Sequence, residues 1–163
     1  MKRLGSLSYT AFAGERQDTV HGGYIYMLES IGIYMDSYGG LQYGADLKWN
    51  TPLKGLLLGA AHMNQDITGR GKFILPGAAP ETATPYEEHS NKDYATQFSA
   101  QYVRGNFRVE GEYRRWWRDQ QIFNDTASVT TDTRGRYTAA AYRISKRLEF
   151  GIVLFAPGAS LGR

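Results

Sequence analysis

The chain has 163 residues, enough for one domain, and its 42% hydrophobic and 13% aromatic content excludes an intrinsically disordered protein. Its 19 basic and 16 acidic residues give a net charge of +3 and are interleaved without a basic run, so we expect no nucleic-acid partner. It contains no cysteine, which excludes a disulfide scaffold and any thiolate metal site.

The first predicted strand covers residues 5–13, where Leu7, Tyr9 and Ala11 alternate with serine or threonine. A period of two places each set on one face of a strand. The segment 14–39 that follows is predicted as a long loop. Its apolar stretch at 24–35 is open between a short helix packed into the barrel mouth and an eighth strand, and we favour a structured loop.

Residues 41–50 give the clearest alternation in the chain. The odd positions read Leu41, Tyr43, Ala45, Leu47 and Trp49, and the even positions read Gln42, Gly44, Asp46, Lys48 and Asn50. A helix would scatter these residues around its circumference, so the segment predicts a strand with one apolar and one polar face. A turn is predicted at 51–54, because Pro52 cannot continue a ladder. A strand at 56–65 follows. Which of its side chains lie on which face of the sheet stays open, because three leucines are consecutive.

A second hairpin is predicted over residues 94–118, after a polar loop at 66–93 and with its turn at 104–106. One face carries Tyr94, Thr96, Phe98, Ala100 and Tyr102 on the first arm, and Phe107, Val109, Gly111, Tyr113 and Trp117 on the second. The other face is polar, with Gln97, Ser99 and Gln101 followed by Arg108, Glu110, Glu112, Arg114 and Arg118.

A third hairpin covers residues 136–155 with its turn at 145–147, after a loop at 119–133, and brings the total to seven strands. Short turns and long loops alternate along the chain, so all the long loops lie at one end of an up-and-down sheet. Transmembrane barrels have this arrangement, and strands of about ten residues suit a tilted membrane crossing. We therefore predict an all-β fold: an antiparallel up-and-down meander of about seven strands, part of a transmembrane β-barrel, as a single partial domain over residues 1–163.

In such a barrel the two faces of the sheet meet different solvents. Aromatic residues near both strand ends match the girdles that barrels place at the two membrane interfaces. The predicted lipid-facing and girdle residues are Leu41, Tyr43, Leu47, Trp49, Tyr94, Phe98, Tyr102 and Trp117. The predicted pore-lining residues are Gln42, Asp46, Lys48, Gln97, Ser99, Gln101, Arg108, Glu110, Glu112 and Arg114. In a soluble sandwich, by contrast, the aromatic residues form the core and the charged face is the solvated outside.

Two segments carry a resemblance to a known class of protein: residues 40–52, which read GLQYGADLKWNTP, and residues 142–151, which read YRISKRLEFG. Each resembles the hairpins of Gram-negative outer-membrane porin-like proteins, including the phosphate-selective group. The resemblance implies a location in the bacterial outer membrane, contact with outer-membrane lipid, and passive diffusion of small polar solutes without a cofactor. A homo-oligomer of the intact barrel is left open.

Three features depart from intact barrels of this class. Seven strands is an odd number, whereas bacterial single-chain barrels have even numbers. The basic opening of the chain has no apolar signal-peptide region behind it, and the segment 154–163 is not a terminal aromatic strand. We therefore expect a fragment of a barrel, whose two unpaired edges prevent the isolated chain from spanning a membrane stably.

Residue types used by enzymes and metal sites are present, but not in the required patterns. None of His21, His62 and His89 has a second ligand at metal spacing, and arginines bracket Glu110 and Glu112. We predict no catalytic residues, no metal site and no enzyme activity. Two rival hypotheses stay open: a soluble lipocalin-like β-barrel or sandwich that binds a small ligand, and a non-conducting structural or adhesive outer-membrane barrel.

Overall fold

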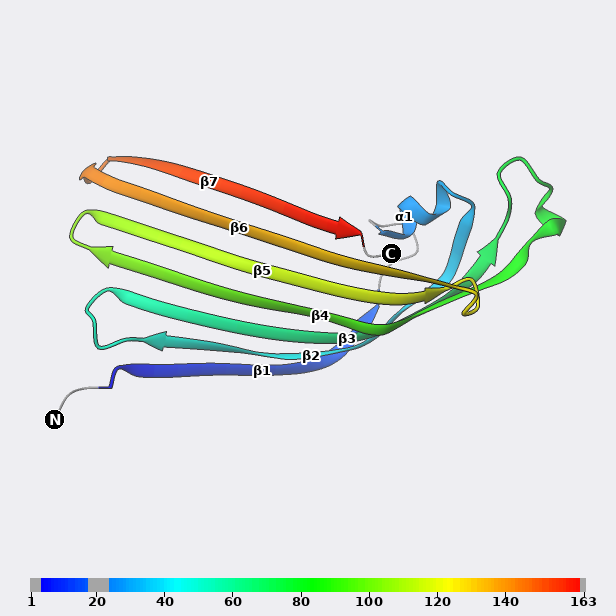
Figure 1. Cartoon of the computed structure of the whole chain (residues 1–163), viewed down its shortest axis with the longest axis horizontal. Coiled ribbons are helices and arrows are strands. Elements are labelled where there is room, and N and C mark those ends of the chain that lie inside the picture. The colour runs from blue at the N-terminus through cyan, green and yellow to red at the C-terminus, as the bar shows by residue number, and fades with distance from the viewer. Residues whose placement is uncertain (1–3, 18–23, 162–163) are drawn as a thin grey trace.

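The computed structural model describes residues 4–17 and 24–161, which form one antiparallel β-sheet of seven strands (Figure 1). Each strand pairs with the next one along the sequence. The strands are β1 Ser6–Gln17, β2 Ile33–Asn50, β3 Leu56–Phe73, β4 Thr84–Arg104, β5 Phe107–Ile122, β6 Ala127–Ser145 and β7 Leu148–Leu161. The predicted all-β meander of seven strands is therefore confirmed, and the sheet is open rather than closed.

The three short turns lie where the sequence predicts them, between β2 and β3, between β4 and β5, and between β6 and β7. Gly55 has a φ of 91° in the first of these turns. A Cβ atom at position 55 would also collide with the Val103 carbonyl group. Only glycine meets both conditions without strain.

We expect Gly55→Ala to lower the free energy of unfolding by about 1–2 kcal/mol, because a residue with a Cβ is strained in the left-handed region. Gly135→Ala is the matched control, since a Cβ at that position in β6 meets nothing within 4 Å. Urea titration of the chain folded in detergent micelles measures both values. Equal unfolding midpoints for the two variants would disprove this account of the turn.

The strands extend further toward the long connections than the sequence predicts. The predicted loops at 14–39, 66–93 and 119–133 contain the ends of six strands, so those loop bounds are wrong. β-Bulges at Met35/Ser37, Gln65/Thr68 and Ser90/Lys92 explain the error for β2, β3 and β4. A bulge shifts the side-chain alternation by one residue while the ladder continues, so the period-two pattern is lost there. In β5 and β6 the ladder continues without a bulge through a segment that is polar on both faces.

A short helix, α1, occupies Tyr24–Glu29, and β2 begins at Ile33, so the stretch 24–35, whose conformation the sequence left open, holds a helical turn and the start of a strand. The helix packs over the sheet in a small core, which consists of Ile25, Leu28, Ile33, Met35, Tyr38, Ile67 and Tyr86. A single 3-10 turn, η1, lies at Pro80–Thr82. Neither of these helical elements of the described chain is long and apolar enough to cross a membrane.

The cross-strand register divides the side chains between two faces. The apolar face carries Leu47, Phe98, Tyr113 and Leu154 together with the residues in register with them. The polar face carries Asp46, Gln97 and Arg114 together with their neighbours in register. The register also shows which face each side chain of residues 56–65 occupies. Leu58 lies beside Trp49 on the apolar face, and Leu57 lies on the polar face.

The apolar face is uncovered over most of its area. Phe98 is 54% exposed and Leu154 is 65% exposed, while α1 and its core lie on the opposite, polar face, where Ile67 is in register with Gly40. The accessible surface of the chain is 11750 Å². A compact monomer of this mass would expose only about 8,100 Å². A single-layer sheet with so much exposed apolar surface requires an apolar neighbour.

Candidate pore-lining face

The ten residues predicted to line a pore all lie on the polar face. Asp46, Gln97 and Arg114 form one row across the sheet, and Lys48, Ser99 and Glu112 form the next row toward the short turns. The remaining four positions follow from the same register: Gln42, Gln101, Glu110 and Arg108. The eight predicted lipid-facing residues all lie on the apolar face, so the sheet separates the two sets completely.

Charges of both signs alternate along this face near the short turns. Arg108 Nε donates a hydrogen bond to Glu110 Oε2 at 3.0 Å, and Gln101 Nε2 donates to the same oxygen at 3.2 Å. Lys48 Nζ lies 3.5 Å from Asp46 Oδ1. Exposed pairs of this kind contribute about 0–1 kcal/mol to stability. Their main effect is therefore on the electrostatic potential of the face, and they add little to the fold.

Small residues lie among the charged ones on the polar face. They include Gly44, Gly59, Ala61, Ala139 and Gly151. The polar character weakens toward the two edges of the sheet, where Phe12 lies on β1 and Phe155 on β7. The ring of Phe155 packs 6.1 Å from that of Tyr137. The strongest polar character thus belongs to the middle strands, from β2 to β5.

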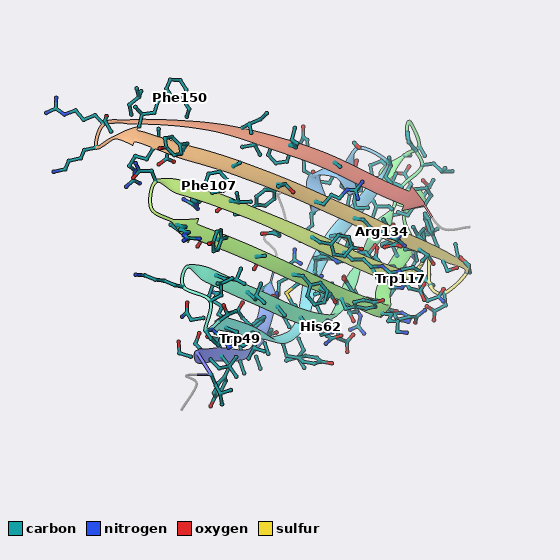
Figure 2. All side chains as sticks on the ribbon, turned by 60° about the vertical axis from the view of Figure 1, so that its left-hand side comes forward. Trp49, His62, Phe107, Trp117, Arg134 and Phe150 are labelled. Atoms are coloured by element: carbon teal, nitrogen blue, oxygen red, sulfur yellow. The ribbon has the colours of Figure 1, made fainter. Side chains whose placement is uncertain are left out.

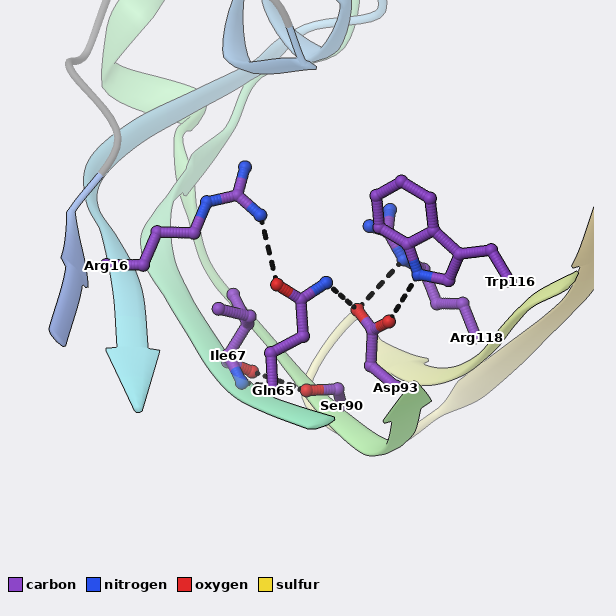
Figure 3. Close-up of polar contacts among 7 residues, drawn as sticks. All are labelled: Arg16, Gln65, Ile67, Ser90, Asp93, Trp116 and Arg118. Atoms are coloured by element: carbon purple, nitrogen blue, oxygen red, sulfur yellow. Dashed lines mark hydrogen bonds and ion pairs between the residues drawn. The ribbon is translucent and has the colours of Figure 1, made fainter. Parts of the chain in front are cut away.

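A second polar group lies on the same face nearer the long connections, and the sequence did not predict it. We call it the Asp93 cluster, and Figure 3 shows its members on the inner side of the curved sheet: Arg16, Gln65, Asp93, Trp116 and Arg118. The Asp93 carboxylate accepts hydrogen bonds from Trp116 Nε1 at 2.6 Å, from Gln65 Nε2 at 2.9 Å and from Arg118 Nε at 3.1 Å. Arg16 Nη1 donates to Gln65 Oε1 at 3.2 Å. These contacts join β1, β3, β4 and β5.

Burial makes the contacts of Asp93 important to the fold. Its side chain is only 1% exposed, and that of Arg118 is 23% exposed. A buried carboxylate requires its partners, because they replace the water that it loses. Ser90 satisfies the backbone at the adjacent bulge: its Oγ accepts from the Ile67 amide at 2.8 Å and donates to the Ile67 carbonyl at 3.2 Å. Side-chain hydrogen bonds thus stabilise the sheet where the bulges interrupt the backbone ladder between β3, β4 and β5.

One signal in the sequence pointed to the Asp93 cluster. The predicted strands at 56–65 and 94–104 pair Asn64 with Tyr94, and one further step of the same ladder places Gln65 beside Asp93. Asp93 was missed as a site residue because it was taken as the last residue of the loop at 66–93. Trp116 was left out of the predicted polar face, although the period of two places it there between Arg114 and Arg118.

The described residues include no group of three His, Asp or Glu side chains that could hold a metal ion. His62 Nδ1 lies 2.8 Å from Thr96 Oγ1 on the apolar face, and His89 Nδ1 lies 3.3 Å from Asp125 Oδ1. The third histidine, His21, lies outside the described residues, as do the basic opening at 1–3 and residues 162–163.

Comparisons with models of protein families, with curated proteins and with solved structures give no match to this chain. The architecture of the sheet and the chemistry of its two faces are therefore the grounds on which a function is assigned.

Proposed function

We propose that this sheet is part of the wall of a porin-like β-barrel in the bacterial outer membrane, through which small polar solutes diffuse passively. The observation that carries the proposal is the separation of side chains between the faces. The convex face is apolar and uncovered, and the concave face is polar and carries charges of both signs. Lipid outside and water inside would satisfy both faces at once.

The spacing of aromatic residues on the apolar face fits the thickness of a membrane. Tyr94 and Tyr102 lie eight residues apart on β4, and Phe107 and Trp117 lie ten residues apart on β5. At the usual rise and tilt these spacings cover about 20 Å and about 26 Å of membrane depth, close to the ~25 Å apolar band of known barrels. Figure 2 shows Phe107 and Phe150 near the short turns, and Trp117 toward the opposite end.

The proposed role requires a closed barrel, in which further strands pair with β1 and β7. Each of these strands has one unpaired edge in the described sheet, and lipid cannot satisfy the backbone groups there. Because the six pairings are all antiparallel, β1 and β7 run in the same direction. Antiparallel closure therefore needs an odd number of additional strands, which gives the even total of bacterial barrels.

One observation favours the non-conducting alternative. Helix α1 and its core lie on the polar face at the end of the long connections, where they reduce the space inside a barrel. The soluble lipocalin-like alternative has less support, because a ligand-binding barrel of that kind needs its apolar side chains on the concave face.

We expect the closed barrel to conduct ions in a planar bilayer, and R108E/R114E to raise its cation-to-anion permeability ratio. The substitutions replace two positive charges on the polar face with two negative ones, and charge rings set ion preference. The reversal potential under a salt gradient measures the ratio, and R108K/R114K, which keeps both charges, should leave it unchanged. Insertion without conductance would favour the non-conducting barrel. Conductance with an unchanged reversal potential in R108E/R114E would remove these arginines from the pore.

A further inference from the structure

Three arginines interrupt the apolar face on β5 and β6. Arg115 lies between Tyr113 and Trp117 along β5, and Arg134 is directly in register with it on β6. Arg136 lies on the same face, in register with Tyr113. We call Arg115, Arg134 and Arg136 the arginine patch. Beyond their immediate neighbours this face carries mainly aromatic and aliphatic side chains, among them Phe98, Phe150 and Leu154, so the patch requires its own explanation.

The patch carries more positive charge than its surroundings neutralise. Asp132 accepts hydrogen bonds from Arg115 Nε at 2.8 Å and from Arg134 Nε at 3.0 Å. In the described part of the chain, Arg136 has no carboxylate within ion-pair distance. Among the described residues, three guanidinium groups therefore share one carboxylate, an excess of two positive charges. The Arg134 side chain is 56% exposed, so this charge is accessible from outside the sheet.

A hollow beside the patch gives an anion room to bind. It has a volume of about 270 Å³ and is lined by Tyr113, Arg134, Gly135, Arg136, Ala156 and Gly158. The hollow forms because β7 places only Ala156 and Gly158 beside the two arginines of β6. Since a water molecule occupies about 30 Å³ of liquid, the space exceeds that of several waters.

The patch lies at the depth where lipid headgroups would meet the proposed barrel. Arg115 is eight residues beyond Phe107, which corresponds to about 20 Å of membrane depth above the short-turn girdle. The Arg115 guanidinium lies 5.2 Å from the centre of the Trp117 ring, and a cation–π contact of this kind suits an interfacial position. Figure 2 shows Arg134 and Trp117 toward the same end of the sheet.

We propose that the arginine patch binds the phosphate group of an anionic lipid in the leaflet next to the long connections. This inference rests on the proposed function, because it requires the apolar face to contact lipid. Guanidinium groups bind phosphate through paired, charge-assisted hydrogen bonds. The excess positive charge, the open hollow and the interfacial depth all fit a lipid headgroup whose acyl chains continue along the apolar face.

Native mass spectrometry of the chain in non-ionic micelles tests the proposal, with phosphatidylglycerol and phosphatidylcholine of the same acyl length as probes. We expect phosphatidylglycerol to bind in preference, and R134Q/R136Q to weaken its binding by about tenfold, because charge-assisted contacts are lost. R108Q/R114Q removes the same charge from the polar face and should bind as the unmodified chain does. R136Q alone leaves Asp132 with both of its partners, and should weaken binding even if the double variant does not fold.

Three results would overturn the proposal: equal binding of the two lipids, equal losses in R134Q/R136Q and R108Q/R114Q, or tight binding of inorganic phosphate alone that displaces the lipid. A dimer that disappears in R134Q/R136Q would instead assign the patch to contact between two copies of the chain. Circular dichroism before lipid is added separates this test from the proposed function. A chain that is folded in micelles but shows no lipid preference contradicts only the lipid site, whereas the conductance of the closed barrel tests the proposed function separately.

Discussion

Replacement of Asp93 with alanine is expected to lower the free energy of unfolding by about 3–5 kcal/mol, the cost of breaking a buried ion pair. The substitution removes the common acceptor of Gln65, Trp116 and Arg118. Because the Asp93 side chain is 1% exposed, water cannot replace the lost carboxylate without opening the sheet. Arg118 would then keep a positive charge at a partly buried site with its carboxylate partner removed.

Asp46→Ala is the matched control for Asp93→Ala. Asp46 is a carboxylate on the same face, but it is 36% exposed and lies 3.5 Å from Lys48. Its removal should change stability by no more than about 1 kcal/mol. Urea unfolding in micelles, followed by tryptophan fluorescence, measures both variants. If both unfold at the same urea concentration, the Asp93 cluster does not hold the irregular end of the sheet.

Phe98→Arg is the second substitution with a large expected effect, because it separates a membrane-facing sheet from a soluble one. Phe98 lies midway between Tyr94 and Tyr102 on the apolar face, which is the middle of the proposed membrane band. An arginine at the bilayer midplane costs a barrel about 2–4 kcal/mol. On a water-exposed surface, the same change at a residue that is 54% exposed would stay within about 0.5 kcal/mol.

Ser99→Arg provides the control for Phe98→Arg, since the neighbouring residue points to the polar face and is also exposed. We expect Ser99→Arg to leave stability within about 0.5 kcal/mol of the unmodified chain. The folded fraction in lipid or detergent as a function of urea measures the pair. If Phe98→Arg is as harmless as Ser99→Arg, the apolar face does not lie against hydrocarbon.

The regular part of the fold was predictable because its signals are local. Residues 41–50 alternate without interruption, and the turn that follows contains Pro52 and requires Gly55. Such signals located the short turns and assigned the predicted residues to their faces. The predictions ended at the bulges, where one additional residue, such as Asp36 in β2, shifts the period while the hydrogen bonds continue.

The Asp93 cluster and the arginine patch were not predictable from local patterns, because both depend on pairing between strands. Asp93 binds Gln65, 28 residues earlier, and Arg118, 25 residues later. Arg115 and Asp132 are 17 residues apart and meet only because β5 and β6 pair in this register. In the sequence, Arg115 is one of several basic residues beside two tryptophans. The period of two places Arg115 on the apolar face, but only the register brings Arg134 and Arg136 beside it.

The measurement that tests the central claim most directly is solvent access along β4. The chain has no cysteine, so single cysteines at positions 96–101 can each carry one spin label without interference. With the chain folded in micelles, we expect labels at 96, 98 and 100 to be relaxed by oxygen, which dissolves in hydrocarbon. Labels at 97, 99 and 101 should be relaxed by a water-soluble nickel complex. Equal access of the nickel complex at all six positions, or alternation in the opposite phase, would contradict a sheet with its apolar face in lipid.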